Sequence, residues 1–225
     1  MINTKKYHKI INELNGKATL VAVSKTKPIE DIHALYDMGH RDFGENYVQE
    51  LTEKYEHLPK DIRWHFIGHL QSNKVKYIAP FIHLIHGVDS PGLLKEINKQ
   101  ALKNNRTIDC LLQVYIAKEE TKFGFNEHEL FELLDTSTGS VHELKNIRIT
   151  GLMGMASFSD DMNLVRTEFK YLKKLFDLYA SLPIANCQLS TLSMGMSADY
   201  KIALEEGSNM VRIGSLLFGE RNYNG

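Results

Sequence analysis

The sequence predicts an α/β fold, a single (β/α)8 barrel of the TIM type that spans residues 1–225 and carries an additional N-terminal helix. Three observations predict it. Eight short apolar runs rich in Val and Ile alternate with longer stretches of helical period. The runs are almost continuously apolar, which is typical of a parallel sheet covered by helices. The length of 225 residues fits eight compact βα units. The alternative is a doubly wound open sheet.

The first elements follow from periodicity and from the residues that bound them. An amphipathic segment over Thr4–Leu14 predicts a leading helix. The apolar run Thr19–Val23 predicts the first strand, and a helix is expected from about Ile29 to Met38. Pro28 suits the first turn of this helix because proline presets the helical φ. Gly39 suits its end because glycine tolerates a left-handed cap.

The rest of the chain repeats this alternation of strand and helix. The expected pairs are a strand near Arg41–Phe43 with a helix over about Tyr47–Tyr55, the run 62–68 with a helix through 73–79, the run 81–89 with a helix over 90–105, the run 108–116 with a helix over about Glu127–Leu134, the run 147–155 with a helix over Met162–Leu182, the run 187–195 with a helix over 197–207, and the run 209–215, the one strand after which no helix is expected. Ser90 and Pro91 indicate an N-cap followed by proline at the first helical position.

Composition and charge exclude several classes of protein. The net charge of −1 gives no general attraction to nucleic acid or to an acidic membrane surface. Residues 1–16 lack the apolar stretch of a secretory signal, and no apolar run is long enough to cross a bilayer. Cys110 and Cys187 lie far apart in apolar runs, which predicts two buried structural thiols and no disulfide framework. We therefore expect a cytoplasmic protein that binds neither nucleic acid nor membrane.

Lys25 raises the first question about function, because the predicted strand Thr19–Val23 leads into it and buried strands seldom end on a charge without a reason. In a (β/α)8 barrel, functional groups gather at the C-terminal ends of the strands. The segments LSMGMS (192–197) and VRIGS (211–215) end the seventh and eighth strands, and their glycines and serines suit a phosphate site. Barrel closure places the eighth strand beside the first, so Lys25 is expected next to that site.

Two functions of Lys25 fit this position. The lysine can pair with a phosphate as a point charge. Its amine can also form a Schiff base with a phosphorylated aldehyde such as pyridoxal phosphate, and desolvation at a strand end favours this by lowering the pKa of a lysine. The simpler alternatives are a surface lysine and, for SMGMS, a turn with an N-cap. The hypothesis therefore depends on three elements meeting at the ends of adjacent strands.

Five segments carry a resemblance to a known family: AVSKTKP, FGENYVQE, WHFIGHLQSNK, LSMGMSADY and VRIGSLLFGER. With these segments in order from about Val21 to Arg221, the chain resembles the pyridoxal phosphate homeostasis protein family, which is related to the barrel domain of alanine racemase. No single segment is decisive, but five in register are highly specific. The resemblance implies one alanine racemase N-terminal-like barrel domain over 1–225, with pyridoxal 5′-phosphate (PLP) as its cofactor.

The resemblance also implies roles for individual residues. It assigns the internal aldimine with PLP to Lys25 and a position near the pyridine nitrogen to Arg212. It places the remaining cofactor-binding residues at the phosphate or in the pocket: Ser193, Gly214 and Ser215 at the phosphate, Met194 beside them, and Asn46 in the pocket. One departure is Tyr115, which stands in QVY where the family commonly has QVN. This substitution is expected at the pocket edge, away from the lysine, the arginine and the phosphate loops.

The residues and the resemblance together predict a PLP carrier or buffer in vitamin B6 homeostasis. An arginine keeps the pyridine nitrogen unprotonated, so the ring is a poor electron sink. Racemisation also needs a second acid–base group, which a further domain of the partner subunit supplies in alanine racemase, and the barrel occupies this whole chain. We expect a monomer without catalytic residues that passes PLP to amino acids or PLP-dependent enzymes. The alternative is a PLP-dependent amino acid racemase.

A metal hydrolase is a third possibility, since His65, His69, His83 and His86 lie close together in the sequence. No Asp or Glu joins them in a recognisable metal motif. On a strand and loop, the i,i+4 spacing of His65 and His69 does not put both rings on one face. Strand packing explains His65, and His69 could line the pocket or pack in a loop. We therefore expect no metal.

Overall fold

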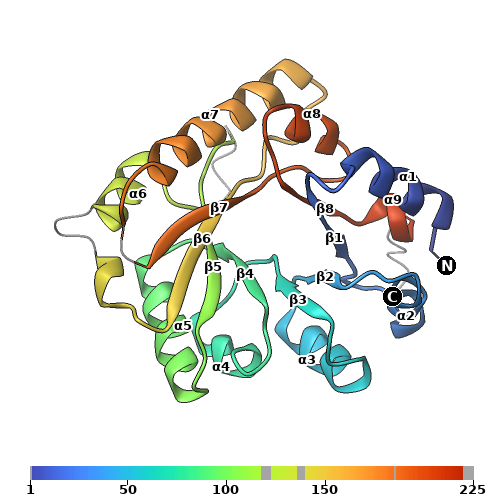
Figure 1. The fold of residues 1–225 in the computed structure, drawn as a ribbon, viewed down its shortest axis with the longest axis horizontal. Helices are drawn as coiled ribbons and strands as arrows, with labels where there is room; N and C mark the ends of the chain where they lie inside the picture. Colours follow the sequence, from blue (N-terminus) through green and yellow to red (C-terminus); the bar gives the residue numbers. More distant parts are fainter. Residues whose placement is uncertain (1, 118–122, 136–139, 185, 220–225) are drawn as a thin grey trace.

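Eight parallel strands close into a barrel in the computed structural model, which describes residues 2–117, 123–135, 140–184 and 186–219 (Figure 1). The strands pair in chain order, and β8 closes the ring against β1 with Arg212 opposite Val21. Their bounds are β1 Thr19–Val23, β2 Asp42–Glu45, β3 Arg63–Phe66, β4 Leu84–Val88, β5 Ile108–Gln113, β6 Ile147–Met153, β7 Cys187–Ser193 and β8 Met210–Ile213. The predicted (β/α)8 barrel is confirmed, and the alternative of an open sheet is wrong.

Helices form an outer ring around the strands (Figure 1). Their bounds are α1 Thr4–Leu14, α2 Ile29–Asp37, α3 Val48–His57, α4 Val75–Ile78, α5 Pro91–Lys103, α6 Glu127–Leu134, α7 Met162–Ala180, α8 Tyr200–Glu205 and α9 Ser215–Phe218, with short 3-10 helices η1 Ser72–Lys74 and η2 Ser140–Glu143. The predicted N-terminal helix is therefore confirmed. Because α9 is a single turn, α1 takes the place of an outer helix after β8. It packs on α9, and the Asn3 N–H donates to the Leu217 carbonyl (2.7 Å).

The strand β2 differs from its prediction. It spans Asp42–Glu45, whereas the sequence predicts a strand near Arg41–Phe43. The polar end of the strand is buried because the Glu45 carboxylate accepts from Lys54 Nζ (2.8 Å) and from the Ser24 hydroxyl (2.7 Å). A buried strand can continue through a charged residue when neighbouring elements supply its partners.

Several helices also begin or end at residues other than those predicted from the sequence. Pro28 caps α2 just before its first turn, and Gly39 follows its end with a φ of +91°, as the prediction of a left-handed stop requires. The helix α8 begins at Tyr200 and not at 197. A turn precedes it, in which the Asp199 carboxylate accepts from the Met196 N–H (2.6 Å). The helix α9 follows β8, where the sequence predicts none.

The inside of the barrel combines apolar and polar side chains. An apolar cluster consists of Val21, Leu84, Leu111, Met153 and Met210. A second and larger core fills the space between the strands and the outer helices. Because successive residues of a strand face opposite sides, residues two positions beyond the apolar cluster continue the inner surface toward the carboxyl ends of the strands.

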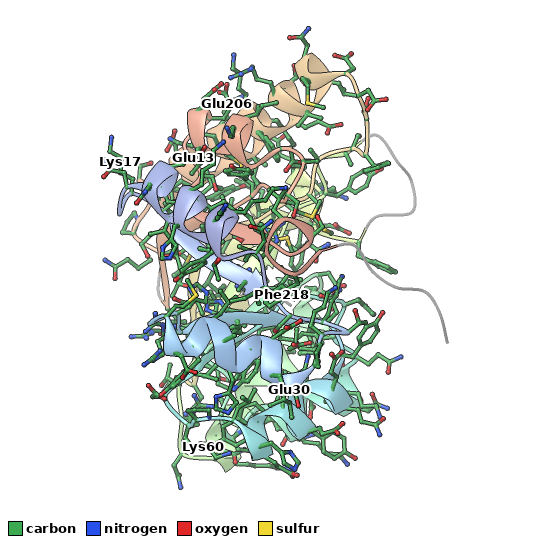
Figure 2. All side chains as sticks on the ribbon, turned by 90° about the vertical axis from the view of Figure 1, so that its right-hand side faces the viewer. Glu13, Lys17, Glu30, Lys60, Glu206 and Phe218 are labelled. Atoms are coloured by element: carbon green, nitrogen blue, oxygen red, sulfur yellow. The ribbon has the colours of Figure 1, made fainter. Side chains whose placement is uncertain are left out.

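Exposed charged side chains such as Glu30 on α2 and Lys60 after α3 lie on the outside of the ring (Figure 2). Cys110 is buried as predicted, but Cys187 is partly exposed, so the prediction of two buried thiols is correct only for the first. Burial raises the pKa of both thiols, that of Cys187 to about 12. Within the described ranges, no helix has the length and apolar character that crossing a membrane requires.

Candidate functional site

Strand alternation places several predicted residues on one inner surface. Val21, Val23 and Lys25 are spaced by two along β1 and its extension. Val21 lies in the apolar cluster, whereas Val23 and Lys25 line a cavity beyond it. On β8 the same spacing puts Arg212 and Gly214 on the cavity wall. Lys25 and Arg212 therefore share one cavity at the carboxyl ends of the strands, as barrel closure predicts.

The cavity has a volume of about 710 Å³, within the usual range for small-molecule sites. Its wall comes from the segments that follow β1, β2, β3, β6, β7 and β8. Of the predicted site residues, Lys25, Asn46, Arg212, Gly214 and Ser215 lie on it. The other residues on the wall are Val23, Lys27, Ile67, Met155, Ala156, Ser157, Phe158, Ser159, Asp160, Met162, Val165, Met196, Ser197, Ala198, Asp199 and Gly219.

A buried charged cluster lies directly behind the turn after β1. We call it the Lys54 cluster, and its members are Ser24, Glu45, Glu50 and Lys54. Lys54 Nζ donates to the carboxylates of Glu45 (2.8 Å) and Glu50 (2.6 Å) and to the Ser24 carbonyl (2.8 Å). Burial raises the pKa of Glu45 to about 7, although Lys54 opposes this shift. Glu45 Oε2 has no hydrogen-bond partner in the described part of the chain.

The Lys54 cluster fixes both neighbours of Lys25. On one side, Ser24 belongs to the cluster. On the other side, the Glu50 carboxylate accepts from the Thr26 N–H (2.6 Å), and Thr26 has a φ of +62°. This left-handed conformation is strained for a β-branched residue, and it turns the chain sharply after the strand. Lys25 is thus presented to the cavity from a turn that is held on both sides.

Arg212 supplies a buried cation to the same cavity. It is only 4% exposed, and its Nη1 and Nη2 donate to the Ser193 hydroxyl (2.7 Å) and the Gly154 carbonyl (3.1 Å). Burial lowers the pKa of Arg212 to about 10, with Asp199 opposing the shift, so the guanidinium remains charged at neutral pH. None of the salt bridges among the described residues involves Arg212. Its charge is therefore suited to an acceptor on a ligand.

The loops after β7 and β8 meet at the cavity. The Ser197 hydroxyl accepts from the Gly214 N–H (3.3 Å), which joins the two loops. The Asp199 carboxylate holds the first loop by accepting from the Met196 N–H (2.6 Å). Ser197, Gly214 and Ser215 all line the cavity. Together they offer two hydroxyl groups on a close-fitting backbone, an arrangement suited to a phosphate.

Two residues predicted to lie at the phosphate, Ser193 and Met194, do not line the cavity. Ser193 is fully buried, with its hydroxyl between Arg212 Nη1 (2.7 Å) and His86 Nδ1 (3.2 Å). Met194 is fully buried in the core outside the barrel. The physical reason is that β7 extends through Ser193, so this residue is still inside the barrel. The serine of LSMGMS that reaches the cavity is Ser197, which belongs to the segment predicted from the sequence, whereas the resemblance points to Ser193.

Asn46 follows β2 and carries an unsatisfied polar atom. Its Oδ1 is buried and accepts no hydrogen bond from any described residue. Leaving such an oxygen without a donor costs about 1–3 kcal/mol. Because Asn46 lines the cavity, a ligand with a hydroxyl or other donor would satisfy it. Tyr115, the departure from the family pattern, does not line the cavity, and its backbone N–H donates to the Phe125 carbonyl (2.9 Å).

The loop after β6 forms part of the cavity rim. The Glu168 carboxylate on α7 accepts from both the N–H and the hydroxyl of Ser157 (2.7 Å each), and Glu168 is itself buried. The next residue, Phe158, is 94% exposed, and Met162 and Met196 are also exposed. Apolar side chains therefore border the cavity from two loops: Phe158 and Met162 follow β6, where the buried Glu168 carboxylate holds Ser157, and Met196 follows β7.

The four histidines considered as metal ligands are divided among other contacts. His65 lies between His86 (2.9 Å) and Asp42 (3.1 Å), and the ring of His83 meets that of His65 edge-on. His69 Nδ1 is hydrogen-bonded to the carboxylate of Asp89, which follows β4 (2.8 Å). The described residues contain no group of three or more His, Cys, Asp or Glu that could hold a metal ion.

Known proteins resemble this chain over most of its length. The family "Alanine racemase, N-terminal domain" matches residues 3–222. The pyridoxal phosphate homeostasis protein of Aquifex aeolicus (strain VF5) is 45% identical over 207 residues, which cover 92% of this chain and 88% of the relative. The protein of the same name from Synechocystis sp. (strain ATCC 27184 / PCC 6803 / Kazusa) is 38% identical over 226 residues, which cover 98% of this chain and 100% of the relative.

Solved structures agree with these relatives. PipY of Synechococcus elongatus PCC7942 with PLP bound is 31% identical, with a TM-score of 0.86 over 96% of this chain and 99% of that chain. An alanine racemase of Clostridium difficile 630 shows the shared fold alone, at 15% identity and a TM-score of 0.77 over 98% of this chain and 57% of that chain. The barrel, the matched domain and the relatives lead to one conclusion: this chain belongs to the pyridoxal phosphate homeostasis protein family.

Proposed function

We propose that this protein binds PLP in the cavity at the carboxyl ends of the strands and holds it covalently on Lys25, as a carrier or buffer in intracellular PLP homeostasis. One observation carries the proposal. Lys25, the Arg212 cation and the joined loops after β7 and β8 converge on a single cavity of about 710 Å³. The names of the relatives and the PLP in the PipY structure support this choice of ligand.

The residues on the cavity wall fit the parts of such a cofactor. The hydroxyls of Ser197 and Ser215, beside Gly214, suit its phosphate. The unsatisfied Asn46 Oδ1 suits a donor on the ring. Arg212 can only donate hydrogen bonds, so it suits the pyridine nitrogen as an acceptor. The cavity thus offers a separate partner to each polar part of PLP.

Lys25 provides the covalent link. When bound, PLP would offer an aldehyde, and Lys25 would hold it through a C=N bond to the aldehyde carbon, with the carbonyl oxygen leaving as water. The Lys54 cluster holds the turn on both sides of the lysine, so the amine is offered from a fixed base. Because this linkage is reversible, the cavity can both store PLP and release it to amino acids or to PLP-dependent enzymes.

The cavity wall favours a carrier over a racemase. Racemisation needs a second acid–base group across the substrate from the lysine. No Tyr, His or Cys occurs among the described residues that line the cavity, and the acid–base groups on this wall besides Lys25 and Arg212 are Lys27, Asp160 and Asp199. We therefore infer a cytoplasmic, monomeric carrier without turnover, with a PLP-dependent amino acid racemase as the second candidate.

The test of the proposed function is an adduct on Lys25. Purified protein is incubated with PLP, its absorption spectrum is recorded, and borohydride reduction is followed by peptide mass mapping. We expect a spectrum distinct from that of free PLP and a reduced pyridoxyl group on Lys25, absent in Lys25→Ala. Lys27→Met, a change on the same cavity wall, should retain the adduct. A wild-type protein without adduct on Lys25 would overturn the proposal.

The racemase alternative has its own measurement. D- or L-amino acids are added to the PLP-loaded protein, and optical activity is followed over time. A carrier should lose optical activity no faster than an equal concentration of free PLP. Turnover well above that rate, abolished in Lys25→Ala, would establish an enzyme.

A further inference from the structure

A chain of hydrogen-bonded side chains crosses the inside of the barrel from Arg212 to Asp42. The Ser193 hydroxyl lies 2.7 Å from Arg212 Nη1 and 3.2 Å from His86 Nδ1. His86 Nε2 lies 2.9 Å from His65 Nδ1, and His65 Nε2 lies 3.1 Å from Asp42 Oδ1. We call these five residues the inner chain. It runs from the cavity wall on β8, through β7, β4 and β3, to the start of β2.

The inner chain replaces the packing that a barrel interior usually has. All five of its residues are buried, and the middle three, Ser193, His86 and His65, are at most 1% exposed. Branched apolar side chains normally fill these inner layers. Buried polar groups stabilise a fold only when each finds its hydrogen-bond partners. Two imidazoles in series at these positions therefore indicate a role beyond filling space.

The two ends of the inner chain fix the direction of its hydrogen bonds. Arg212 can only donate, so the Ser193 oxygen accepts from it. At the other end, burial alone would raise the pKa of Asp42, but hydrogen bonds from Arg63 and His65 hold it well below its usual value. Asp42 is therefore ionised and accepts the Nε2–H of His65.

Between these ends only one arrangement gives every group a partner. Neutral His65 accepts at Nδ1, so His86 donates its Nε2–H. Neutral His86 accepts at Nδ1, so the Ser193 O–H donates to it. An extra proton on either ring would leave the Ser193 hydroxyl hydrogen without an acceptor in the inner chain. Burial also lowers the pKa of His86 well below its usual value, which agrees with a neutral ring.

We propose that His86 and His65 are positioning residues for Arg212: the inner chain runs in one direction, from Arg212 through Ser193, His86 and His65 to Asp42, and fixes the guanidinium on the cavity wall. Nη1 is held by Ser193 and Nη2 by Gly154, so the plane of the guanidinium is set from behind. In its relation to PLP this inference rests on the proposed function, because Arg212 is there the partner of the pyridine nitrogen.

The direction of the inner chain is tested first in the PLP-free full-length protein. Long-range ¹H–¹⁵N spectra of protein labelled with ¹⁵N-histidine show which ring nitrogen carries the proton. We expect the rings of His65 and His86 each to carry a proton on Nε2 and none on Nδ1, as the hydrogen bonds of the inner chain require, with the exposed ring of His8 as an internal reference. An imidazolium at either position, or a neutral ring protonated on Nδ1, overturns the proposal.

The positioning effect is tested with Ser193→Ala, which removes the link between Arg212 and His86. We expect the dissociation constant for PLP to rise about tenfold, the loss expected for one buried hydrogen bond to a charged group, and the absorption maximum of bound PLP to shift. Ser193→Thr keeps the hydroxyl and should bind PLP as the wild type does. Unchanged affinity and spectrum in a folded Ser193→Ala protein would overturn the proposal.

Ser208→Ala is the matched control. Ser208 is buried beside the same strands, but its hydroxyl contacts the carbonyls of Leu192, Met194 and Met210 and is not part of the inner chain. This variant should lower stability and leave the PLP affinity and spectrum unchanged. An equal loss of affinity in Ser193→Ala and Ser208→Ala would show a general packing effect and contradict positioning.

Failure of this proposal is separable from failure of the proposed function. The histidine spectra need no cofactor, so they report the inner chain alone. The proposed function fails when borohydride leaves no adduct on Lys25. If both histidines are protonated on Nε2 but Lys25 carries no adduct, the inner chain has no role in PLP binding. If Lys25 carries the adduct but a histidine is the other tautomer, the proposed inner chain is wrong and the proposed carrier function is retained.

Discussion

Two buried polar groups stand behind the proposed PLP cavity, and they differ in charge. The Lys54 cluster, behind Lys25, joins one ammonium to two carboxylates, and Glu45 Oε2 has no partner among the described residues. The inner chain, behind Arg212, places two neutral imidazoles and a hydroxyl in series, with one donor and one acceptor at each link. The stability of the Lys54 cluster therefore depends on the pairing of opposite charges, whereas that of the inner chain depends on an unbroken series of hydrogen bonds.

The position of each group in the barrel explains this difference. Ser24 and Glu45 are on the outward faces of their strands, where the helix α3 covers them and supplies the long side chain of Lys54. Inside the barrel only other strands are within reach, so compact groups such as His86 bridge from one strand to the next. A site at the strand ends can thus be supported by charges from outside and by neutral hydrogen bonds from inside.

The largest effect should come from removing the cation of the Lys54 cluster. Lys54→Met leaves the buried Glu45 carboxylate without its ammonium partner, and breaking a buried ion pair in this way costs about 3–5 kcal/mol. We expect a loss of this size in the free energy of unfolding, measured with urea near neutral pH. Adding Glu45→Gln to Lys54→Met should recover part of it, because the fully buried position 45 then carries no charge, while Glu50, which also loses its ammonium partner, is partly exposed.

Lys99→Met is the matched control for Lys54→Met. Lys99 pairs with Glu96 on an exposed face of α5, and such a surface pair contributes at most about 1 kcal/mol. Equal losses in Lys54→Met and Lys99→Met would mean that the Lys54 cluster does not hold the turn.

The next effect is the pH dependence of stability that Glu45 causes. Burial raises the pKa of Glu45 from its usual 4.5 to about 7, so between these values the folded protein holds a proton that the unfolded chain has released. Its contribution to stability is therefore present at low pH and is lost as the pH rises toward 7. In Glu45→Gln, the unfolding free energy measured with urea at several pH values should fall less over this range than in the wild type. Parallel curves for the two proteins would refute this assignment.

The inner chain should give a pH dependence of stability of the opposite sign. Burial holds the pKa of His86 well below its usual 6.5, so the unfolded chain binds a proton there that the folded protein does not. Stability from this neutral ring is present above about pH 6.5 and is lost as the pH falls. His86→Gln should reduce the loss of unfolding free energy on acidification. If His86→Gln loses as much unfolding free energy on acidification as the wild type, groups other than His86 cause that loss.

Much of the fold follows from local sequence pattern, because buried parallel strands are continuously apolar and helices have their own period. The prediction of Lys25 and Arg212 in one cavity follows from barrel closure, which brings β8 beside β1. The choice between Ser193 and Ser197 could not be made in the same way. It depends on where β7 ends relative to its neighbours, and the stagger between strands of a barrel cannot be predicted from the sequence of one strand.

The two supporting groups were missed for a related reason. From the sequence alone, Glu45 is interpreted as the polar end of a strand. Its role as a buried partner follows only from the fold, which brings Lys54, nine positions later, into contact with it. His65 and His86 can be assigned to the inner face by alternation, but their contact with each other and with Ser193 needs the register of strands far apart in the chain. Sequence pattern therefore predicts which residues reach the cavity better than it predicts what supports them.

The smallest effect should come from the strained turn itself. Thr26 has a φ of +62°, where a β-branched residue costs about 1–3 kcal/mol, and glycine removes this strain while adding about 0.5–1 kcal/mol of backbone entropy cost. Thr26→Gly should therefore raise the free energy of unfolding slightly, by about 1 kcal/mol, because the backbone N–H that Glu50 accepts is retained. The control is Asn105→Gly at a φ of +52°, where asparagine already tolerates the conformation and the gain should be near zero. If Thr26→Gly destabilises the protein while Asn105→Gly does not, the threonine side chain itself holds the turn, and the Lys54 cluster is then only part of what fixes Lys25.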